Sequence, residues 1–122
     1  MIHHRKLIDS FKYACWGIWF AFSNNQNLQI HLAVAVLVVV MSIVFRINAF
    51  EMGILGVIIL LVIAAEMINT AIEEMVDLIT NEHRQEAKIA KDVAAGMVLL
   101  TAVGSVIVGV LVFVPHIMRM FR

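Results

Sequence analysis

The feature that most constrains this chain is a run of 22 residues, Val93–Val114, that contains no ionisable side chain. At about 1.5 Å per residue, a helix of this length crosses a hydrocarbon layer roughly 30 Å thick. Two further apolar runs precede it, at about 30–45 and 52–65. The chain as a whole is 62% hydrophobic, against about 45–50% in ordinary soluble domains. A soluble monomer of 122 residues has no core large enough to enclose so many apolar side chains, so the sequence predicts an integral membrane protein.

The apolar runs predict one all-α membrane domain over residues 1–122 with three transmembrane helices. We expect the spans at about 30–45, 49–79 and 92–114. The second is longer than a bilayer requires, so its C-terminal end should extend into water. Ahead of the spans, residues from about 5 to 22 place their apolar side chains on one helical stripe, with Tyr13, Trp16 and Trp19 suited to the headgroup level. This pattern indicates an N-terminal amphipathic surface helix, which is either a plain membrane anchor or a part of the site.

The charges exclude one class of partner and orient the chain. Nine basic and nine acidic residues leave no net charge, so no basic surface is available for nonspecific binding of nucleic acid. Six Lys and Arg residues precede the first span or lie between the second and third, against three on the other side of the membrane. The positive-inside rule therefore places the N-terminus and the second connection in the cytosol. The single cysteine, Cys15, excludes an internal disulfide.

Four polar residues follow one face of the second span: Glu66, Asn69, Glu73 and Asp77. Their spacings keep them within roughly 80° of the helix circumference. A carboxylate buried in hydrocarbon costs at least about 3 kcal/mol, so such residues normally face a protein interior and have a function. The stripe serves as a set of structural links to neighbouring helices, as a path for ions or protons, or as a catalytic site. Asn69 shares the face of Glu66 and is suited to hold it in place.

A second polar group, residues 81–92, connects the second and third spans and ends in Lys91 and Asp92. A lysine at the mouth of a membrane helix is often only a snorkelling anchor. Together with the acidic stripe, however, it supplies what phosphoryl transfer to a lipid needs: oxygen ligands for a metal ion, a cation for phosphate oxygens and a base for the attacking hydroxyl. The glycine loops GxxxxGK[ST] and GxGxxG are absent. The histidines form no zinc pattern, and we interpret each as an interfacial or loop residue: His3, His4, His31, His83 and His116.

Two motifs carry a resemblance to a known family. The sequence EMINTAIE at 66–73 fits ExxNxAxE, and AKDVAAGMVLL at 90–100 contains AKDxAAG. Together they are similar to the prokaryotic integral-membrane diacylglycerol kinase and undecaprenol kinase family. The likeness extends from about Phe11 to Val112 and includes FKYA at 11–14, the IH pair at 30–31 and VDLI at 76–79. The sequence AKIAKDVAAG is slightly closer to the undecaprenol-phosphorylating branch.

The resemblance implies a homotrimer in the bacterial cytoplasmic (inner) membrane, with active sites shared between neighbouring subunits at the cytosolic interface. Its implied activity is transfer of the γ-phosphate of ATP, with Mg²⁺, to the hydroxyl of a membrane lipid alcohol, either diacylglycerol or undecaprenol. By the family pattern, Glu66 resembles the catalytic base, with Asn69 beside it, and Glu73 resembles the Mg²⁺ ligand. The remaining implied residues approach the nucleotide: Lys91 and Asp92 as a pair in which Lys91 stabilises charge on the transferred phosphoryl group, and Lys6, Tyr13, Glu82, His83 and Arg84 as weaker contacts.

One position departs from the family pattern. Family members commonly have a glutamate before the first span that joins the metal, and Asn25 stands there in this chain. An amide oxygen binds Mg²⁺ but brings no negative charge, so we expect Asn25 to lie near the metal and nucleotide while attracting the cation less. Two alternatives remain open: a non-catalytic family member that keeps the trimer, and a small ion or proton transporter that uses the Glu66–Glu73 stripe.

Overall fold

The computed structural model describes residues 4–122, with side chains from Lys6 onward, and His3 lies outside this range. The described chain is helical throughout, with no strand between residues 4 and 122. Its elements, in order, are α1 (His4–Asn24), α2 (Gln26–Val44), α3 (Ala49–Ile79) and α4 (Gln85–Met120). Three of them, α2, α3 and α4, are long and apolar enough to cross a membrane. The structure therefore confirms the predicted all-α fold class with three membrane-crossing helices.

The helices extend further than the predicted spans. α2 begins at Gln26, ahead of the predicted 30, and α4 begins at Gln85 and continues to Met120, beyond the predicted 92–114 on both sides. An apolar run in the sequence marks only the part of a helix that lies in the hydrocarbon. The helical backbone hydrogen bonds can continue beyond it into polar sequence, so the observed helices are longer than the predicted spans. In the first turns of α4, the polar extension is also linked by a Lys88–Asp92 ion pair, Nζ to Oδ2, at 2.6 Å.

Asparagine side chains cap the N-termini of two of the membrane helices, α2 and α3. The Oδ1 atom of Asn25 accepts a hydrogen bond from the backbone N–H of Leu28, and that of Asn48 accepts one from Glu51. These are N-cap contacts, which satisfy N–H groups that have no partner within the helix. The short turn between α2 and α3 also contains Arg46 in the left-handed region, at a φ of 52°. Capping and this turn together reverse the chain direction within a few residues.

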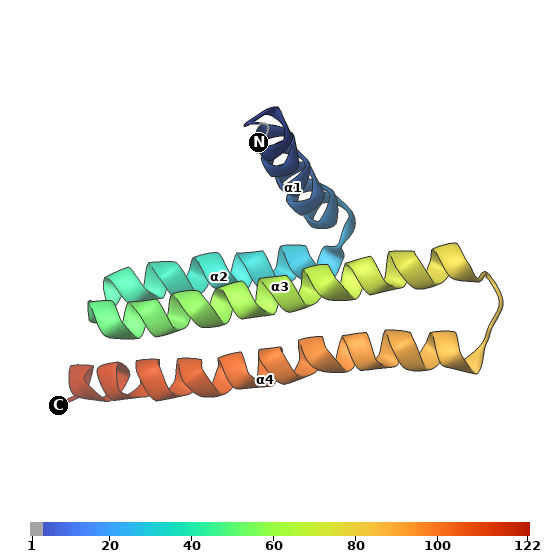
Figure 1. Cartoon of the computed structure of the whole chain (residues 1–122). Helices are drawn as coiled ribbons and strands as arrows, with labels where there is room; N and C mark the ends of the chain where they lie inside the picture. The colour runs from blue at the N-terminus through green and yellow to red at the C-terminus, as the bar shows by residue number, and fades with distance from the viewer. Residues whose placement is uncertain (1–3) are drawn as a thin grey trace.

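Helix α3 is the central helix, packed against both α2 and α4, while α1 projects from the bundle at an angle (Figure 1). The start of α2 lies beside residues 66–70 of α3, because Asn25 contacts Glu66 and Thr70. The rest of α3, to Ile79, therefore continues for about 14 Å past the junction of α1 and α2. The first turns of α4 run beside this extension (Figure 1). The polar ends of α3 and α4 thus stand beyond the level at which α1 leaves the bundle.

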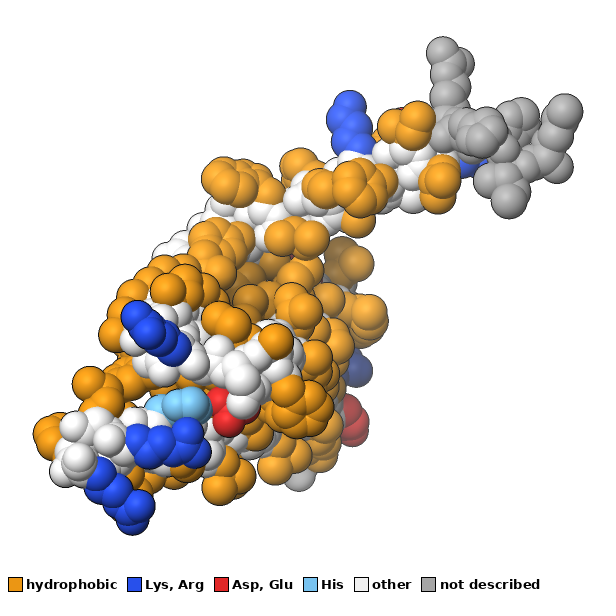
Figure 2. Space-filling view, turned by 90° about the vertical axis from the view of Figure 1, so that its left-hand side faces the viewer, with side chains coloured by type: hydrophobic (Ala, Val, Ile, Leu, Met, Phe, Trp, Pro, Cys, Tyr) orange, Lys and Arg blue, Asp and Glu red, His pale blue; other side chains and the backbone are white. Residues whose placement is uncertain are grey.

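The apolar core of the single chain is small. It gathers at the far end of the bundle around Ile47, Leu55, Val112 and Phe113. Most large apolar side chains along the membrane helices are exposed, and Figure 2 shows the hydrophobic surface that they form. A patch of this extent is unfavourable in water and is typical of a surface covered by lipid or by another subunit.

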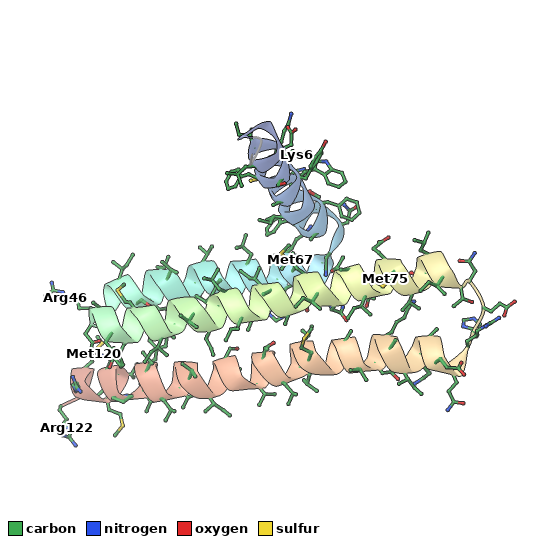
Figure 3. The ribbon with its side chains drawn as sticks, viewed as in Figure 1. Lys6, Arg46, Met67, Met75, Met120 and Arg122 are labelled. Atoms are coloured by element: carbon green, nitrogen blue, oxygen red, sulfur yellow. The ribbon has the colours of Figure 1, made fainter. Side chains whose placement is uncertain are left out.

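The end of the bundle seen in Figure 2 also carries polar side chains. There His116 of α4 and Glu51 of α3 lie 2.8 Å apart, Nε2 to Oε2. Arg46 and Arg122 lie at this same end (Figure 3). The connection between α3 and α4, residues 80–84, lies at the opposite end of the bundle. Of the basic residues counted for the orientation, Arg84 and Lys88 lie at or next to this connection, Arg46 and Arg122 lie at the other end, and Lys6 lies on the projecting α1 (Figure 3).

Candidate active site

The site is built around two buried polar side chains of α3. Glu66 is 2% exposed and Asn69 is 8% exposed, whereas most of the helix surface around them is apolar. They lie three residues apart and so share one face of the helix, as the sequence predicted. A buried carboxylate requires hydrogen-bond donors, since its desolvation otherwise costs several kcal/mol. The structure supplies those donors from α2.

Asn25 joins the start of α2 to this face of α3. Its Nδ2 lies 3.3 Å from Oε2 of Glu66 and donates to Oγ1 of Thr70 at 2.7 Å. The Thr70 hydroxyl in turn donates to the backbone oxygen of Glu66 at 3.0 Å. Since the Oδ1 atom of Asn25 also caps α2, one side chain fixes both where α2 begins and where it meets the acidic face. The sequence predicts Asn25 at the site, whereas its capping role and its contact with Thr70 emerge only from the structure.

His31 contacts Glu66 from the other side. Its Nε2 lies 3.4 Å from Oε1 of Glu66, and the imidazole is half-buried. We interpreted His31 as an interfacial or loop residue. The structure places it within helix α2 and not in a loop, and its contact with Glu66 was not predicted. The signal available in the sequence was a single ionisable residue within an otherwise uncharged span. Its place on the face of α2 toward Glu66 depends on where that helix begins.

Glu73 lies one turn beyond Asn69, whose Nδ2 donates to Oε1 of Glu73 at 3.2 Å. Both line a polar pocket of about 340 Å³, as do Asn25, Thr70 and the neighbouring Glu74. The Oδ1 atom of Asn69 is buried and has no hydrogen-bond partner within the described chain. A buried oxygen atom without a hydrogen-bond partner is available to bind a metal ion or a water molecule.

These residues fit one kind of metal site. Among the side chains described, from Lys6 to Arg122, no three of His, Cys, Asp or Glu gather closely enough to enclose an ion. Mg²⁺, however, is usually held by one or two carboxylates together with substrate phosphates, because it retains much of its hydration. The carboxylate of Glu73 beside the free Oδ1 of Asn69 matches that requirement. The Oδ1 atom of Asn25 already accepts one N–H.

A second polar cluster lies further along α3, where the helix faces the start of α4. Lys91 donates from Nζ to Oδ1 of Asp77 at 2.6 Å and so links the two helices. Asp92 instead pairs with Lys88 of its own helix. Lys91 and Asp92, the two predicted nucleotide contacts at the start of α4, are thus adjacent in sequence but contact different side chains, Asp77 and Lys88.

The connection between the two helices closes this cluster. The Nε atom of Arg84 donates to Oε2 of Glu82 at 3.2 Å. These two residues and His83 line a pocket of about 770 Å³ that Asp77, Lys91 and Asp92 also border. The structure therefore brings five predicted nucleotide-contact residues to one pocket: Glu82, His83, Arg84, Lys91 and Asp92.

Lys6 and Tyr13 do not join either cluster. Both are exposed on α1, and neither lines the pockets described above. Figure 3 shows Lys6 on the part of α1 that projects away from the three-helix bundle. Within the described part of one chain, the predicted site residues thus form two groups, one where the start of α2 meets α3 and one between the end of α3 and the start of α4, and leave these two apart.

A comparison with protein families places the chain. The model described as prokaryotic diacylglycerol kinase matches residues 12–113. The chain belongs to the prokaryotic diacylglycerol kinase family. This match confirms the resemblance inferred from the ExxNxAxE and AKDxAAG motifs, over nearly the same residues. The family is one of lipid kinases, whose activity implies a nucleotide substrate and usually a divalent metal ion.

Three relatives illustrate the similarity. An undecaprenol kinase of Bacillus subtilis is 39% identical over 112 residues, which cover 92% of this chain and 91% of the relative. A diacylglycerol kinase of Synechocystis is 38% identical over 115 residues, or 93% of this chain, which spans only 66% of that relative's length. A diacylglycerol kinase of Haemophilus influenzae is 31% identical over 109 residues, which cover 88% of this chain and 92% of the relative. These three relatives thus include both an undecaprenol kinase and diacylglycerol kinases.

Proposed function

We propose that the protein is a membrane lipid kinase that transfers the γ-phosphate of ATP to the hydroxyl of a lipid alcohol, undecaprenol or diacylglycerol. The observation that carries the proposal is the buried carboxylate of Glu66, held by α2 next to a polar pocket at the junction of α1 with the membrane helices. At this level an apolar substrate in the bilayer and a charged substrate from the cytosol can meet. Membership of a kinase family supports the same reaction class.

Glu66 is the proposed general base. Its carboxylate accepts the proton of the lipid hydroxyl while the hydroxyl oxygen attacks the γ-phosphorus, and ADP leaves with the electrons of the broken bond. A positioned base of this kind contributes about 10²–10⁴-fold to a rate. Asn69 stands one turn away on the same face and is proposed to act beside Glu66. Most of the remaining acceleration comes from positioning and charge neutralisation.

The nucleotide is proposed to lie along the second half of the acidic face. Glu73, with Asn69 and Asn25 close by in the same pocket, would hold Mg²⁺. Bound there with the nucleotide, the ion would neutralise phosphate oxygens. Lys91 would stabilise charge on the transferred phosphoryl group. The other contacts to ATP are assigned to Asp92 and, more weakly, to Glu82, His83 and Arg84.

Lys6 and Tyr13 are proposed to reach the nucleotide within a homotrimer whose active sites are shared between neighbouring subunits. Two observations support this assembly: the extensive apolar surface of the single chain, and the absence of both residues from the lining of the two polar pockets. We further propose that the protein lies in the bacterial cytoplasmic membrane with its N-terminus in the cytosol, since six of nine Lys and Arg residues fall on that side.

The test is phosphorylation of lipid by the purified protein in vesicles. Vesicles that contain undecaprenol, diacylglycerol or neither are incubated with Mg²⁺ and ATP labelled in the γ-phosphate, and the lipids are extracted. We expect label in one or both lipid phosphates and none in vesicles without a lipid alcohol. If every lipid alcohol stays unlabelled while the protein is folded and assembled, the proposal is wrong and the non-catalytic alternative is supported.

A further inference from the structure

We propose that His31 is a positioning residue for phosphoryl transfer, which holds the carboxylate of Glu66 in its reactive orientation. The inference rests on the proposed function, because it assigns a role relative to the proposed base. It goes beyond that function by adding a residue that neither motif contains. Three observations support it.

The first observation is how the two oxygens of Glu66 are held. Oε2 faces Nδ2 of Asn25 at 3.3 Å, and Oε1 faces Nε2 of His31 at 3.4 Å. Each contact is long compared with a strong hydrogen bond, yet together they determine the plane of a carboxylate that is 2% exposed and so has almost no contact with solvent. In the neutral tautomer with a proton on Nε2, the imidazole donates to Oε1.

The second observation is that Asn25 and His31, the two side chains that contact Glu66, differ in their other contacts. Asn25 also caps α2 and donates to Thr70, so its replacement would disturb the helix start as well as Glu66. Glu66 is the one side chain with which His31 has a polar contact in the described chain. The orientation of Oε1 therefore depends on His31, whereas the packing of α2 at this point depends mainly on Asn25 and the buried Leu28.

The third observation is what lies on the other side of the imidazole. His31 lines an apolar cavity of about 360 Å³ between α2, α3 and α4, in which the only other polar side chain is Ser105. The imidazole thus stands between this apolar space and the Glu66 carboxylate. Without it, Oε1 would face hydrocarbon-like surroundings, and the carboxylate would turn toward the polar donors on its other side.

The experiment compares His31→Leu with His31→Gln in the vesicle assay. Leucine removes the polar contact, and we expect it to lower kcat by about 10- to 100-fold, with the KM for ATP and the assembly state unchanged. Glutamine keeps an N–H donor and should restore most of the lost rate. Ser105→Ala, which removes the other polar group of the same cavity, is the matched control and should leave kcat as in the parent.

A double-mutant cycle separates positioning from a general structural role. If His31 acts through Glu66, His31→Leu should cause no further loss of the residual rate in the Glu66→Gln background. An unchanged kcat in His31→Leu, or the same fold loss in both backgrounds, would overturn the proposal. If the parent and His31→Leu phosphorylate lipid equally well, only the role of His31 is refuted and the proposed function stands. A parent that is inactive on every lipid alcohol refutes the proposed function and this role with it.

Discussion

Replacement of Glu66 by glutamine is the most informative single change, because it removes the charge and keeps the shape. The introduced amide oxygen can accept from Nδ2 of Asn25, and the introduced amide nitrogen can donate to a His31 ring whose proton has moved to Nδ1. Both contacts of the side chain are thus retained. A buried charge is replaced by a neutral group of equal volume, which is not expected to unfold the protein.

The expected magnitude follows from the role of the carboxylate. Loss of a positioned general base lowers a rate by about 10²–10⁴-fold, which corresponds to about 2.7–5.4 kcal/mol in activation free energy. Glu66 is buried and does not line the polar pocket that contains Glu73. We therefore expect the KM for ATP to change less than threefold, or about 0.7 kcal/mol. The thermal midpoint should stay within about 5 °C of the parent.

The assay measures initial rates of label transfer from ATP to lipid at several ATP concentrations. Glu51→Gln is a matched control, because Glu51 is a second glutamate of α3 that contacts a histidine, His116, at the opposite end of the bundle. The control should retain the parent rate. Full turnover by Glu66→Gln would refute the role of Glu66 as base, and an equal loss in Glu51→Gln would show that both substitutions act through the fold.

Three further predictions concern neighbouring residues. Glu73→Gln should raise the Mg²⁺ and ATP concentrations needed for half-maximal rate before it lowers kcat, which titration of each ligand measures. Asn25→Glu brings a second carboxylate to the Oε2 side of Glu66, so its activity and thermal midpoint should depend more steeply on Mg²⁺ than those of the parent. Magnesium curves that coincide would mean that Asn25 is not near the ion. Leu28→Ala should destabilise the protein by about 2–5 kcal/mol, because Leu28 is 1% exposed in the first turn of α2, and its denaturant midpoint in detergent measures that loss.

Periodicity and apolar length were sufficient to predict the helical fold and the shared face of Glu66 and Asn69. A helix position is set by local spacing, so residues three or four apart on α3 meet without knowledge of the other helices. The contacts of His31 and Asn25 with Glu66 were not predictable in the same way. They depend on where α2 begins against α3, and that register is set by packing between segments about 40 residues apart in the sequence.

The polar segment 81–92 also differs between the sequence-based prediction and the structure. Residues 81–92 were treated as a link between spans, whereas the structure continues α4 as a helix from Gln85. The helical start of α4 allows Lys91 to face Asp77 of α3. The family resemblance implies Lys91 and Asp92 as two contacts to the nucleotide. Adjacent residues on a helix point about 100° apart, so Lys91 contacts Asp77 of α3 while Asp92 contacts Lys88 of its own helix.

The most direct measurement of the central claim is the sidedness of the reaction in sealed vesicles. A protein with Cys15→Ser and Asn81→Cys carries one thiol, in the connection between α3 and α4, and an impermeant maleimide reports which molecules expose that connection outward. With ATP added only outside, lipid phosphorylation should be proportional to the fraction of outward-facing connections and should require Glu66. Turnover by molecules whose connection faces the ATP-free interior would contradict the account, because the nucleotide would then be used on the other side of the membrane from the acidic extension of α3.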